Sequence, residues 1–316
     1  MKILITCKIF DDLYKKLEEN FEIDYNNSNT PLKKEEIIAR IKDVDALVCP
    51  LSDKIDKEII SSGKNLKIIA NYGAGFDNID LEEANKNNII VTNAPAPSSA
   101  VSTAELAFSL ILATSRRLLE ANKDLKDGNF KAWMPSYMLG QELKGKTLGI
   151  IGLGNIGKNL AKRALAFEMN VLYYSRNRKK DFEDLGLKYM EKEDLIKEAD
   201  IISLHTAYSK ELHHMISDAE FKLMKKDAIL INAARGPLLD EAALIKALKN
   251  KEIKAAGLDV YEFEPKFSQE LAIMENVILL PHIGNATIEA RYEMGRAVVD
   301  NLLDFKTGKK PRNSVN

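Results

Sequence analysis

The chain is 316 residues long, 45% hydrophobic and 29% charged, with a formal net charge of −1. This balance offers no basic surplus for a nucleic-acid partner and no acidic tail, so nucleic-acid binding is not expected. No apolar run reaches the roughly 18 residues of a membrane helix, and the start of the chain lacks a signal-peptide pattern, so we expect a cytoplasmic protein without a membrane partner.

Short β-rich runs alternate with helix-like stretches along the chain. This alternation predicts an α/β fold of doubly wound parallel sheets with helices on both faces. The length predicts two domains, since a domain usually takes about 100–200 residues. The expected strands are Lys2–Cys7, Asp45–Cys49, Leu66–Asn71, Ile89–Asn93, Thr147–Ile151, Asn170–Tyr174, Ile201–His205, Ala228–Ala233, Ala255–Val260 and Val277–Pro281.

Two places have the features of domain boundaries. Residues 93–99 carry two prolines and are typical of a linker, and a long helix is expected after Gly284. We therefore predict a central domain of residues 100–284, inserted into a domain formed by residues 1–99 and 285–316. Two crossings between the domains would make a hinge with a cleft.

The helix expected over Ala100–Leu119 is apolar nearly all round and must be buried on most sides. Packing within its own domain would satisfy that requirement, and so would contact with a second copy. We favour the second explanation, a homodimer formed through this helix. Another long helix is expected over Ala286–Leu303, and the polar residues Thr307–Asn316 after it are predicted to be a surface tail.

A glycine motif of the form GxGxxG directly follows the expected strand Thr147–Ile151 and opens a helix-like stretch. Its glycines permit a tight turn, close approach of a pyrophosphate and close helix–strand packing. The helix N-terminus adds free N–H groups and a partial positive charge. The alternative is a strand–helix turn without a ligand. We predict dinucleotide binding by residues 100–284, with contacts from Gly152, Leu153, Gly154, Asn155, Ile156 and Gly157.

The residues after the next expected strand bear on the cofactor type. NAD-preferring sites usually place an acidic residue here to bind the ribose hydroxyls. This chain instead has Ser175, 18 residues beyond Gly157, followed by Arg176 and Arg178. A hydroxyl and guanidinium groups suit a 2′-phosphate, so we predict NADP(H), with NAD(H) possible and a solvated basic turn as the alternative.

Further polar residues follow the apolar strands of the central domain. Arg235, Asp259, Glu264 and His282 all come at or after expected strand ends. In open α/β sheets, ligands bind outside the carboxyl ends of the strands, and the glycine motif lies on that edge too. Each residue alone has a structural explanation, such as a helix cap or a surface turn. Together they indicate an active site.

This set of side chains suits hydride transfer to a small 2-oxo acid. Arg235 can bind the substrate carboxylate bidentately. The carbonyl oxygen becomes an alkoxide as hydride arrives, and His282 can give it a proton. Glu264 would orient the imidazole ring and favour its charged form. His205 and Thr206, at a strand end, are expected to touch the cofactor. We predict no metal, since no cluster has metal-ligand spacing, and we expect solvated side chains for His213 and His214.

These residues closely resemble the D-isomer-specific 2-hydroxyacid dehydrogenase family. The resemblance implies that Arg235, Glu264 and His282 have the roles given above. It implies a flavodoxin-like substrate domain and a Rossmann cofactor domain joined by a hinge, a homodimer, and D stereochemistry. The matching segments are Asn71–Asp80, Gly152–Gly157, Asn232–Pro237, Ala256–Pro265 and Pro281–Gly284.

The resemblance also assigns binding residues. It implies that the backbone N–H groups of Tyr72, Gly73, Ala74 and Gly75 hold the substrate carboxylate. Within the family, Leu51-Ser52, Met138-Leu139-Gly140 and Tyr173–Arg176 look most like glyoxylate/hydroxypyruvate reductases, so Leu51 and Ser52 are expected to contact substrate. The residues of the matched segments expected to contact cofactor are Ala233, Ala234, Asp259 and Gly284.

Other members of the family remain alternatives. The substrate could instead be D-lactate, 2-ketogluconate or 3-phosphoglycerate, although no further regulatory domain of the kind many phosphoglycerate dehydrogenases carry is seen. Formate dehydrogenases would place Gln where this chain has Glu264. A nucleotide-sensing, corepressor-like binding protein is the non-enzymatic alternative. The segment Thr206-Ala207-Tyr208 lacks the proline and leucine common in the family, which leaves the local cofactor contacts open.

Overall fold

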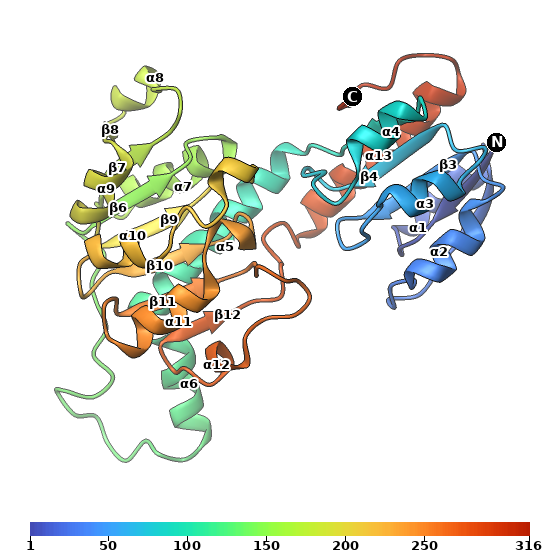
Figure 1. Cartoon of the computed structure of the whole chain (residues 1–316). Coiled ribbons are helices and arrows are strands. Elements are labelled where there is room, and N and C mark those ends of the chain that lie inside the picture. Colours follow the sequence, from blue (N-terminus) through green and yellow to red (C-terminus); the bar gives the residue numbers. More distant parts are fainter. The chain divides into compact units, whose positions relative to one another are not determined.

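Two units, each with its own parallel sheet, make up the chain. A computed structural model describes all 316 residues (Figure 1). Unit 1 comprises Met1–Ser99 and Ala286–Asn316, and unit 2 comprises Ala100–Asn285. No helix of either unit has the length and apolar character needed to cross a membrane.

Unit 1 has a five-stranded parallel sheet of order β2-β1-β3-β4-β5, the flavodoxin-like order. One apolar core involves α1 and α13 on one face, and another involves α2, α3 and α4 on the other. The strands are β1 (Lys2–Ile5), β2 (Glu22–Tyr25), β3 (Ala46–Pro50), β4 (Ile68–Tyr72) and β5 (Ile90–Thr92). The helices are α1 (Asp11–Glu18), α2 (Lys34–Ile41), α3 (Lys57–Ser62), α4 (Leu81–Lys86) and α13 (Ile288–Lys306).

Unit 2 has a seven-stranded parallel sheet of order β12-β11-β10-β9-β6-β7-β8. Its strands are β6 (Thr147–Ile151), β7 (Asn170–Tyr174), β8 (Lys188–Tyr189), β9 (Ile201–Leu204), β10 (Ile229–Asn232), β11 (Ala255–Leu258) and β12 (Val277–Leu279). Its helices are α5 (Pro97–Ser115, which begins in unit 1), α6 (Leu118–Lys126), α7 (Asn155–Ala166), α8 (Lys180–Glu183), α9 (Lys192–Glu198), α10 (Asp218–Leu223), α11 (Glu241–Lys249) and α12 (Gln269–Ala272).

Burial on both faces explains why the predicted strands were visible in the sequence. Strands β9, β10 and β11 are buried at every residue, so they form continuous apolar runs. All ten predicted strands are present, most of them shorter than expected. The prediction missed β2 and β8, which lie at sheet edges and pair with only one neighbour.

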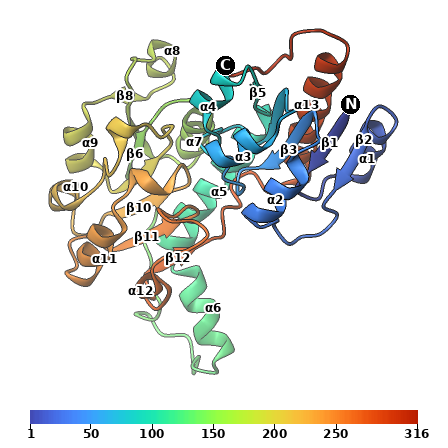
Figure 2. The same ribbon diagram turned by 45° about the vertical axis from the view of Figure 1, so that its right-hand side comes forward.

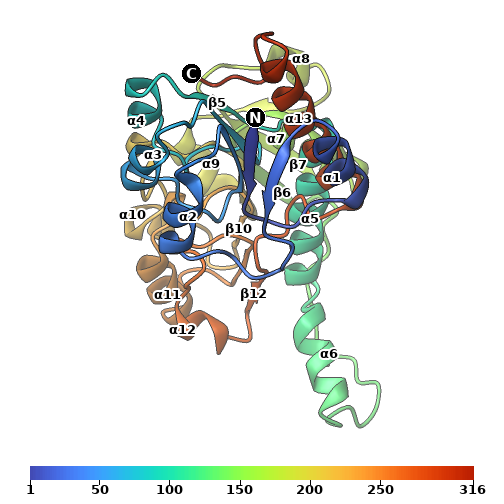
Figure 3. The ribbon, with the colours of Figure 1, turned by 90° about the vertical axis from the view of Figure 1, so that its right-hand side faces the viewer.

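The predicted helix Ala100–Leu119 is not one helix. It ends at Ser115, and Arg117 takes a left-handed backbone conformation before α6 begins. Ala104, Phe108 and Ile111 pack with residues of the strands of unit 2, beside β11 and β12 (Figure 2). Packing within unit 2 therefore buries much of the apolar surface of α5, and the homodimer through this helix stays a prediction. Exposed apolar side chains occur instead in α6 and the segment after it, which project from the unit (Figure 3).

The expected surface tail, Thr307–Asn316, lies along the edge strand β5. Ser314 forms an antiparallel bridge with Thr92, and the Val315 N–H donates to Val91 O at 2.9 Å. The side-chain amide of Asn316 also accepts from the Val91 N–H at 2.8 Å. The tail therefore satisfies backbone groups that an edge strand would otherwise expose.

Candidate active site

The glycine motif leads from β6 into α7 at the carboxyl end of the sheet. Gly152 has a φ of 102°, and a Cβ there would come within 2.6 Å of the His205 backbone, so only glycine fits. At Gly154 a Cβ would meet no atom within 4 Å, so there is open space at the N-terminus of α7. The free N–H groups of that helix turn suit a pyrophosphate. Of the other predicted contact residues, Asn155 and Ile156 begin α7, and Leu153 and Gly157 are buried.

The basic turn after β7 is organised around Glu183. Its carboxylate accepts two hydrogen bonds from Arg178, at 2.7 and 2.6 Å, and one from the Tyr173 hydroxyl at 2.7 Å. The bonds from Arg178, and then from Tyr173, lower the pKa of Glu183 to about 2. Arg178 is therefore occupied within the turn. Ser175 lies just after the strand end, and of the two arginines Arg176 is the one without an ion-pair partner.

The turn that carries Arg235 follows β10 and is shaped by a buried amide. Asn232 Oδ1 accepts from the Ala234 N–H at 3.1 Å, and Asn232 Nδ2 donates to Arg235 O at 3.0 Å. A Cβ at Gly236 would overlap the carbonyl of Tyr261, so the turn packs directly on the segment after β11. This close approach places Arg235 beside the segment that carries Glu264.

Glu264 and His282 form the pair that the sequence predicts. His282 Nδ1 lies 2.8 Å from Glu264 Oε2, and both side chains are 35% exposed. Glu264 Oε1 accepts from the Tyr261 N–H at 2.9 Å. Burial alone would raise the pKa of Glu264. The hydrogen bond and charge of His282, the Tyr261 N–H and the charge of Arg235 lower it by more, so the pKa lies below the ordinary value. Glu264 is therefore ionised at neutral pH.

Asp259 holds the loop on which His282 lies. Its side chain is 1% exposed, and its two carboxylate oxygens accept from the N–H groups of Ile283 at 2.8 Å and Gly284 at 2.7 Å. Burial raises the pKa of Asp259 despite these bonds. His282 itself has a left-handed φ of 54°, which a side chain adopts only when its surroundings impose it. The predicted cofactor residues Asp259 and Gly284 thus hold the loop in place.

The ring of His205 points into the protein. It is 7% exposed, its Nε2 lies 2.7 Å from Ser203 Oγ, and Nδ1 has no hydrogen-bond partner. Burial lowers the pKa of His205 to about 3, so the ring is neutral. Any cofactor contact here comes from the backbone of His205 or from Thr206, which is half-buried. Ala233 and Ala234, also predicted to contact cofactor, are buried after β10.

The predicted substrate loop follows β4 in unit 1. The carbonyl of Gly73 accepts from Ala94 N at 2.8 Å, that of Ala74 from Asn93 Nδ2 at 2.8 Å, and that of Gly75 from Asn71 Nδ2 at 2.7 Å. The N–H groups of these three loop residues donate to no protein acceptor. The ring of Tyr72 is buried, with its hydroxyl on Arg291 O of α13. Leu51 packs over Gly73, and Ser52 is exposed beside it.

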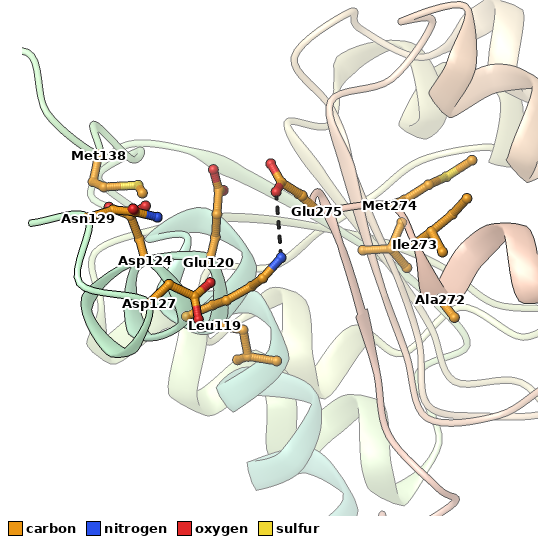
Figure 4. A pocket seen from close by; sticks show the side chains of 12 residues that line it. Leu119, Glu120, Asp124, Asp127, Asn129, Met138, Ala272, Ile273, Met274 and Glu275 are labelled. Atoms are coloured by element: carbon orange, nitrogen blue, oxygen red, sulfur yellow. Dashed lines mark ion pairs between the residues drawn. The ribbon is translucent and has the colours of Figure 1, made fainter.

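A cavity of about 510 Å³ lies elsewhere in unit 2 (Figure 4). Residues of α6 line one side, and the segment Ala272–Val277 lines the other. An ion pair between Lys123 and Glu275 crosses it at 3.9 Å. No predicted site residue lines this cavity, and Val277 belongs to the amino end of β12, whereas His282 follows the carboxyl end.

Three residues of the site were missed by the sequence analysis. A Cβ at Gly284 would lie 3.2 Å from the Thr103 side chain, which places Thr103 at the site, and Asn232 and Tyr261 shape it as described above. Asn232 was detectable, because it is polar within an apolar strand. Thr103 gives a similar signal in the apolar α5. Tyr261 acts through its backbone N–H, which every residue except proline has, so the residue type gives no signal of this role.

Comparison with known proteins gives consistent results. Residues 108–284 match the family model described as D-isomer specific 2-hydroxyacid dehydrogenase, NAD binding domain. A Staphylococcus aureus (strain MRSA252) protein, named as a 2-hydroxyacid dehydrogenase with no substrate in its name, is 47% identical over 316 residues. The match covers 100% of this chain and 99% of that protein.

Solved structures match along the whole chain. The TT0316 protein of Thermus thermophilus has a TM-score of 0.93 and 38% identity, covering 100% of both chains. A glyoxylate reductase of Paecilomyes thermophila has a TM-score of 0.87 and 31% identity, covering 100% of this chain and 98% of the other. A D-lactate dehydrogenase of Aquifex aeolicus, complexed with NAD and lactic acid, has a TM-score of 0.88 and 31% identity, covering 100% and 99%.

The support from Asp259 can be measured as stability. Asp259→Ala leaves two backbone N–H groups of the His282 loop without their acceptor, which we expect to lower the free energy of unfolding by about 2 kcal/mol. Urea unfolding measures the change. Asp227→Ala, at an exposed aspartate, is the control and should change it by less than about 0.5 kcal/mol. Equal effects from both variants would contradict the role given to Asp259.

Proposed function

We propose that this chain, which belongs to the D-isomer specific 2-hydroxyacid dehydrogenase family, is a reductase that converts glyoxylate and hydroxypyruvate to their 2-hydroxy acids with NADPH. The Glu264–His282 pair, 2.8 Å apart, carries this proposal. It provides a proton donor with a charged partner, beside Arg235 and on the sheet edge that holds the glycine motif. The D stereochemistry is that of the family.

The site fits a dinucleotide cofactor. The open space at Gly154 lies at the N-terminus of α7, where free N–H groups can bind phosphate. When bound, the nicotinamide supplies or accepts the hydride. In this proposal Arg235 binds the substrate carboxylate, and His282 gives a proton to the carbonyl oxygen as negative charge develops there. Glu264 keeps the imidazole oriented and favours its charged form.

The loop of unit 1 offers a further set of donors. The carbonyls of Gly73, Ala74 and Gly75 accept hydrogen bonds within the protein, whereas the N–H groups of these residues have no protein acceptor. A row of free N–H groups is suited to a carboxylate. We assign substrate binding to this loop with Tyr72, Leu51 and Ser52.

The preference for NADPH depends on the turn after β7. Ser175 stands where an acidic residue would repel a 2′-phosphate, and Arg176 is exposed and without an ion-pair partner. Reduction of pyruvate to D-lactate is the second candidate, because the D-lactate dehydrogenase of Aquifex aeolicus is as similar to this chain as the glyoxylate reductase is.

A homodimer is also proposed, through the exposed segment that follows α5. We define the arm as residues 118–139, which follow the break at Arg117. Large exposed apolar patches on soluble proteins mark interaction sites, and symmetric homodimers are the commonest assembly. Ile273, exposed across the cavity of Figure 4 from Leu119 of the arm, extends the apolar surface. The most exposed apolar residues of the arm are Leu125 (62%), Trp133 (79%), Met134 (59%) and Leu139 (62%).

Absorbance at 340 nm tests the activity and the cofactor together. We expect the purified protein to oxidise NADPH with glyoxylate and hydroxypyruvate, and faster than NADH. Arg176→Ala should lower the ratio of kcat/KM for NADPH to that for NADH by roughly tenfold, because a phosphate loses a charged hydrogen-bond donor. Lys197→Ala, an exposed cation on α9, is the control. Faster turnover of pyruvate would favour the lactate alternative, and a clear NADH preference would overturn the NADPH proposal.

Removal of the carboxylate tests the catalytic pair. Glu264→Gln leaves the imidazole of His282 without the ionised partner that orients it, and we expect kcat/KM for reduction to fall by roughly a hundredfold. Arg235→Ala should also lower kcat/KM, because the substrate carboxylate loses its anchor. An unchanged kcat/KM in Glu264→Gln would argue against the pairing.

The arm can be tested by adding charge to it. Wild-type protein should sediment at twice the chain mass of 35.4 kDa. The double variant Trp133→Glu with Met134→Glu should sediment as a monomer, because burying two carboxylates in an apolar interface is costly. Leu185→Glu, at a residue 55% exposed outside the arm, is the control and should remain dimeric. A monomeric wild-type protein would rule the homodimer out.

A further inference from the structure

A second group of chemically active side chains lies in unit 2, apart from the catalytic pair. His213, His214 and Glu262 each offer one ligand atom, and these atoms all lie within 4.8 Å of one another. His214 Nε2 is 2.7 Å from Glu262 Oε1. The two imidazole rings are stacked, with centroids 3.9 Å apart and planes inclined by 21°. One nitrogen of each ring and one carboxylate oxygen therefore lie around the same small volume.

The backbone holds two of the three residues in place. His214 has a left-handed φ of 54°, and its N–H donates to Pro237 O at 2.9 Å. The N–H of Glu262 donates to Glu241 Oε1 at 2.7 Å, and Glu241 is only 7% exposed. The side chain of Glu262 is itself 11% exposed. His214 and Glu262 are thus fixed, whereas the exposed His213 is held by ring contacts with His214 and Tyr208.

A second carboxylate, that of Asp240, lies near the other ring nitrogen of His214. Asp240 Oδ2 lies 3.8 Å from His214 Nδ1, on the opposite side of the ring from Glu262. Asp240 is held by Ser217 Oγ at 2.9 Å and caps α11 through the Ala243 N–H at 3.0 Å. Metal-binding histidines commonly donate their second ring N–H to a carboxylate, which fixes the tautomer. At 3.8 Å Asp240 is too far from Nδ1 for a hydrogen bond, so it contributes a nearby negative charge to His214.

We propose that His213, His214 and Glu262 bind one divalent transition-metal ion of the Zn²⁺, Co²⁺ and Ni²⁺ class, with water completing its coordination. Two imidazoles and one carboxylate are a ligand set these ions prefer, whereas Mg²⁺ and Ca²⁺ prefer oxygen ligands alone. On binding, the ring proton of neutral His214 lies on Nδ1, and the lone pair of Nε2 and the carboxylate of Glu262 both face the ion. Sequence spacing could not reveal the site, because Glu262 lies 48 residues beyond His214.

A metal ion at this site would stabilise the fold and would have no part in catalysis. His214 is bonded to the turn of Pro237, and Glu262 belongs to the segment after β11. A bound ion would link these two turns through its ligands. Because the ion binds the folded chain, it should raise the melting temperature without taking part in hydride transfer.

Metal binding to the untagged full chain tests the proposal. Equilibrium dialysis against Zn²⁺ should give one ion per chain, and Co²⁺ should give the visible absorption of a nitrogen- and oxygen-ligated site. His213→Ala and Glu262→Gln should each weaken Zn²⁺ binding by roughly tenfold or more. Glu211→Gln, at an exposed carboxylate nearby, is the control and should bind as the wild type does.

The outcomes separate the possibilities. Loss of binding in His213→Ala with an unchanged melting temperature of the metal-free protein supports the site, because this exposed side chain is not needed for folding. Zn²⁺ affinity unchanged in His213→Ala, or less than one ion per wild-type chain, overturns it. Unchanged affinity in a folded Glu262→Gln shows that the histidine pair alone captures metal, which also overturns the three-residue site. Equal affinity for Mg²⁺ contradicts the ligand class.

Discussion

The buried carboxylate of Asp259 is the constraint on which the site of unit 2 depends. A charge with 1% exposure is costly to bury, and burial accordingly raises its pKa. Two backbone N–H groups, from Ile283 and Gly284, offset that cost. These bonds hold a loop in which His282 takes a left-handed conformation. The position of the proposed proton donor therefore follows from the solvation of one aspartate at the end of β11.

The same segment after β11 connects the remaining catalytic residues. The Tyr261 N–H orients one oxygen of Glu264, and the other oxygen is left for His282. The Tyr261 carbonyl lies so close to Gly236 that the Arg235 turn has no room for a side chain there. Arginine, glutamate and histidine are thus placed by contacts to one segment, residues 259–264, although they are far apart in sequence. Their mutual charges then lower the pKa of Glu264 below its ordinary value.

Sequence reasoning succeeded where local pattern and sheet geometry determine position. Buried parallel strands form apolar runs, and their carboxyl ends meet, so the grouping of Arg235 with Glu264 could be predicted before the structure. It failed where a long-range contact overrides local pattern. The break at Arg117 depends on a left-handed residue with no glycine to signal it. The tail on β5 and the approach of Glu262 to His214 join residues that no local window contains.

The turn after β7 illustrates why residue type alone is insufficient for cofactor specificity. The sequence presents Arg176 and Arg178 as equivalent cations, but Arg178 is bound to Glu183 by two hydrogen bonds. That pairing neutralises a carboxylate that remains ionised well into acidic pH, since its pKa is about 2. In the NADPH site proposed above, Arg178 therefore masks the negative charge of Glu183, and Arg176 is the arginine left to bind a phosphate. The Tyr173 hydroxyl, bonded to the same carboxylate, holds Glu183 where this masking is possible.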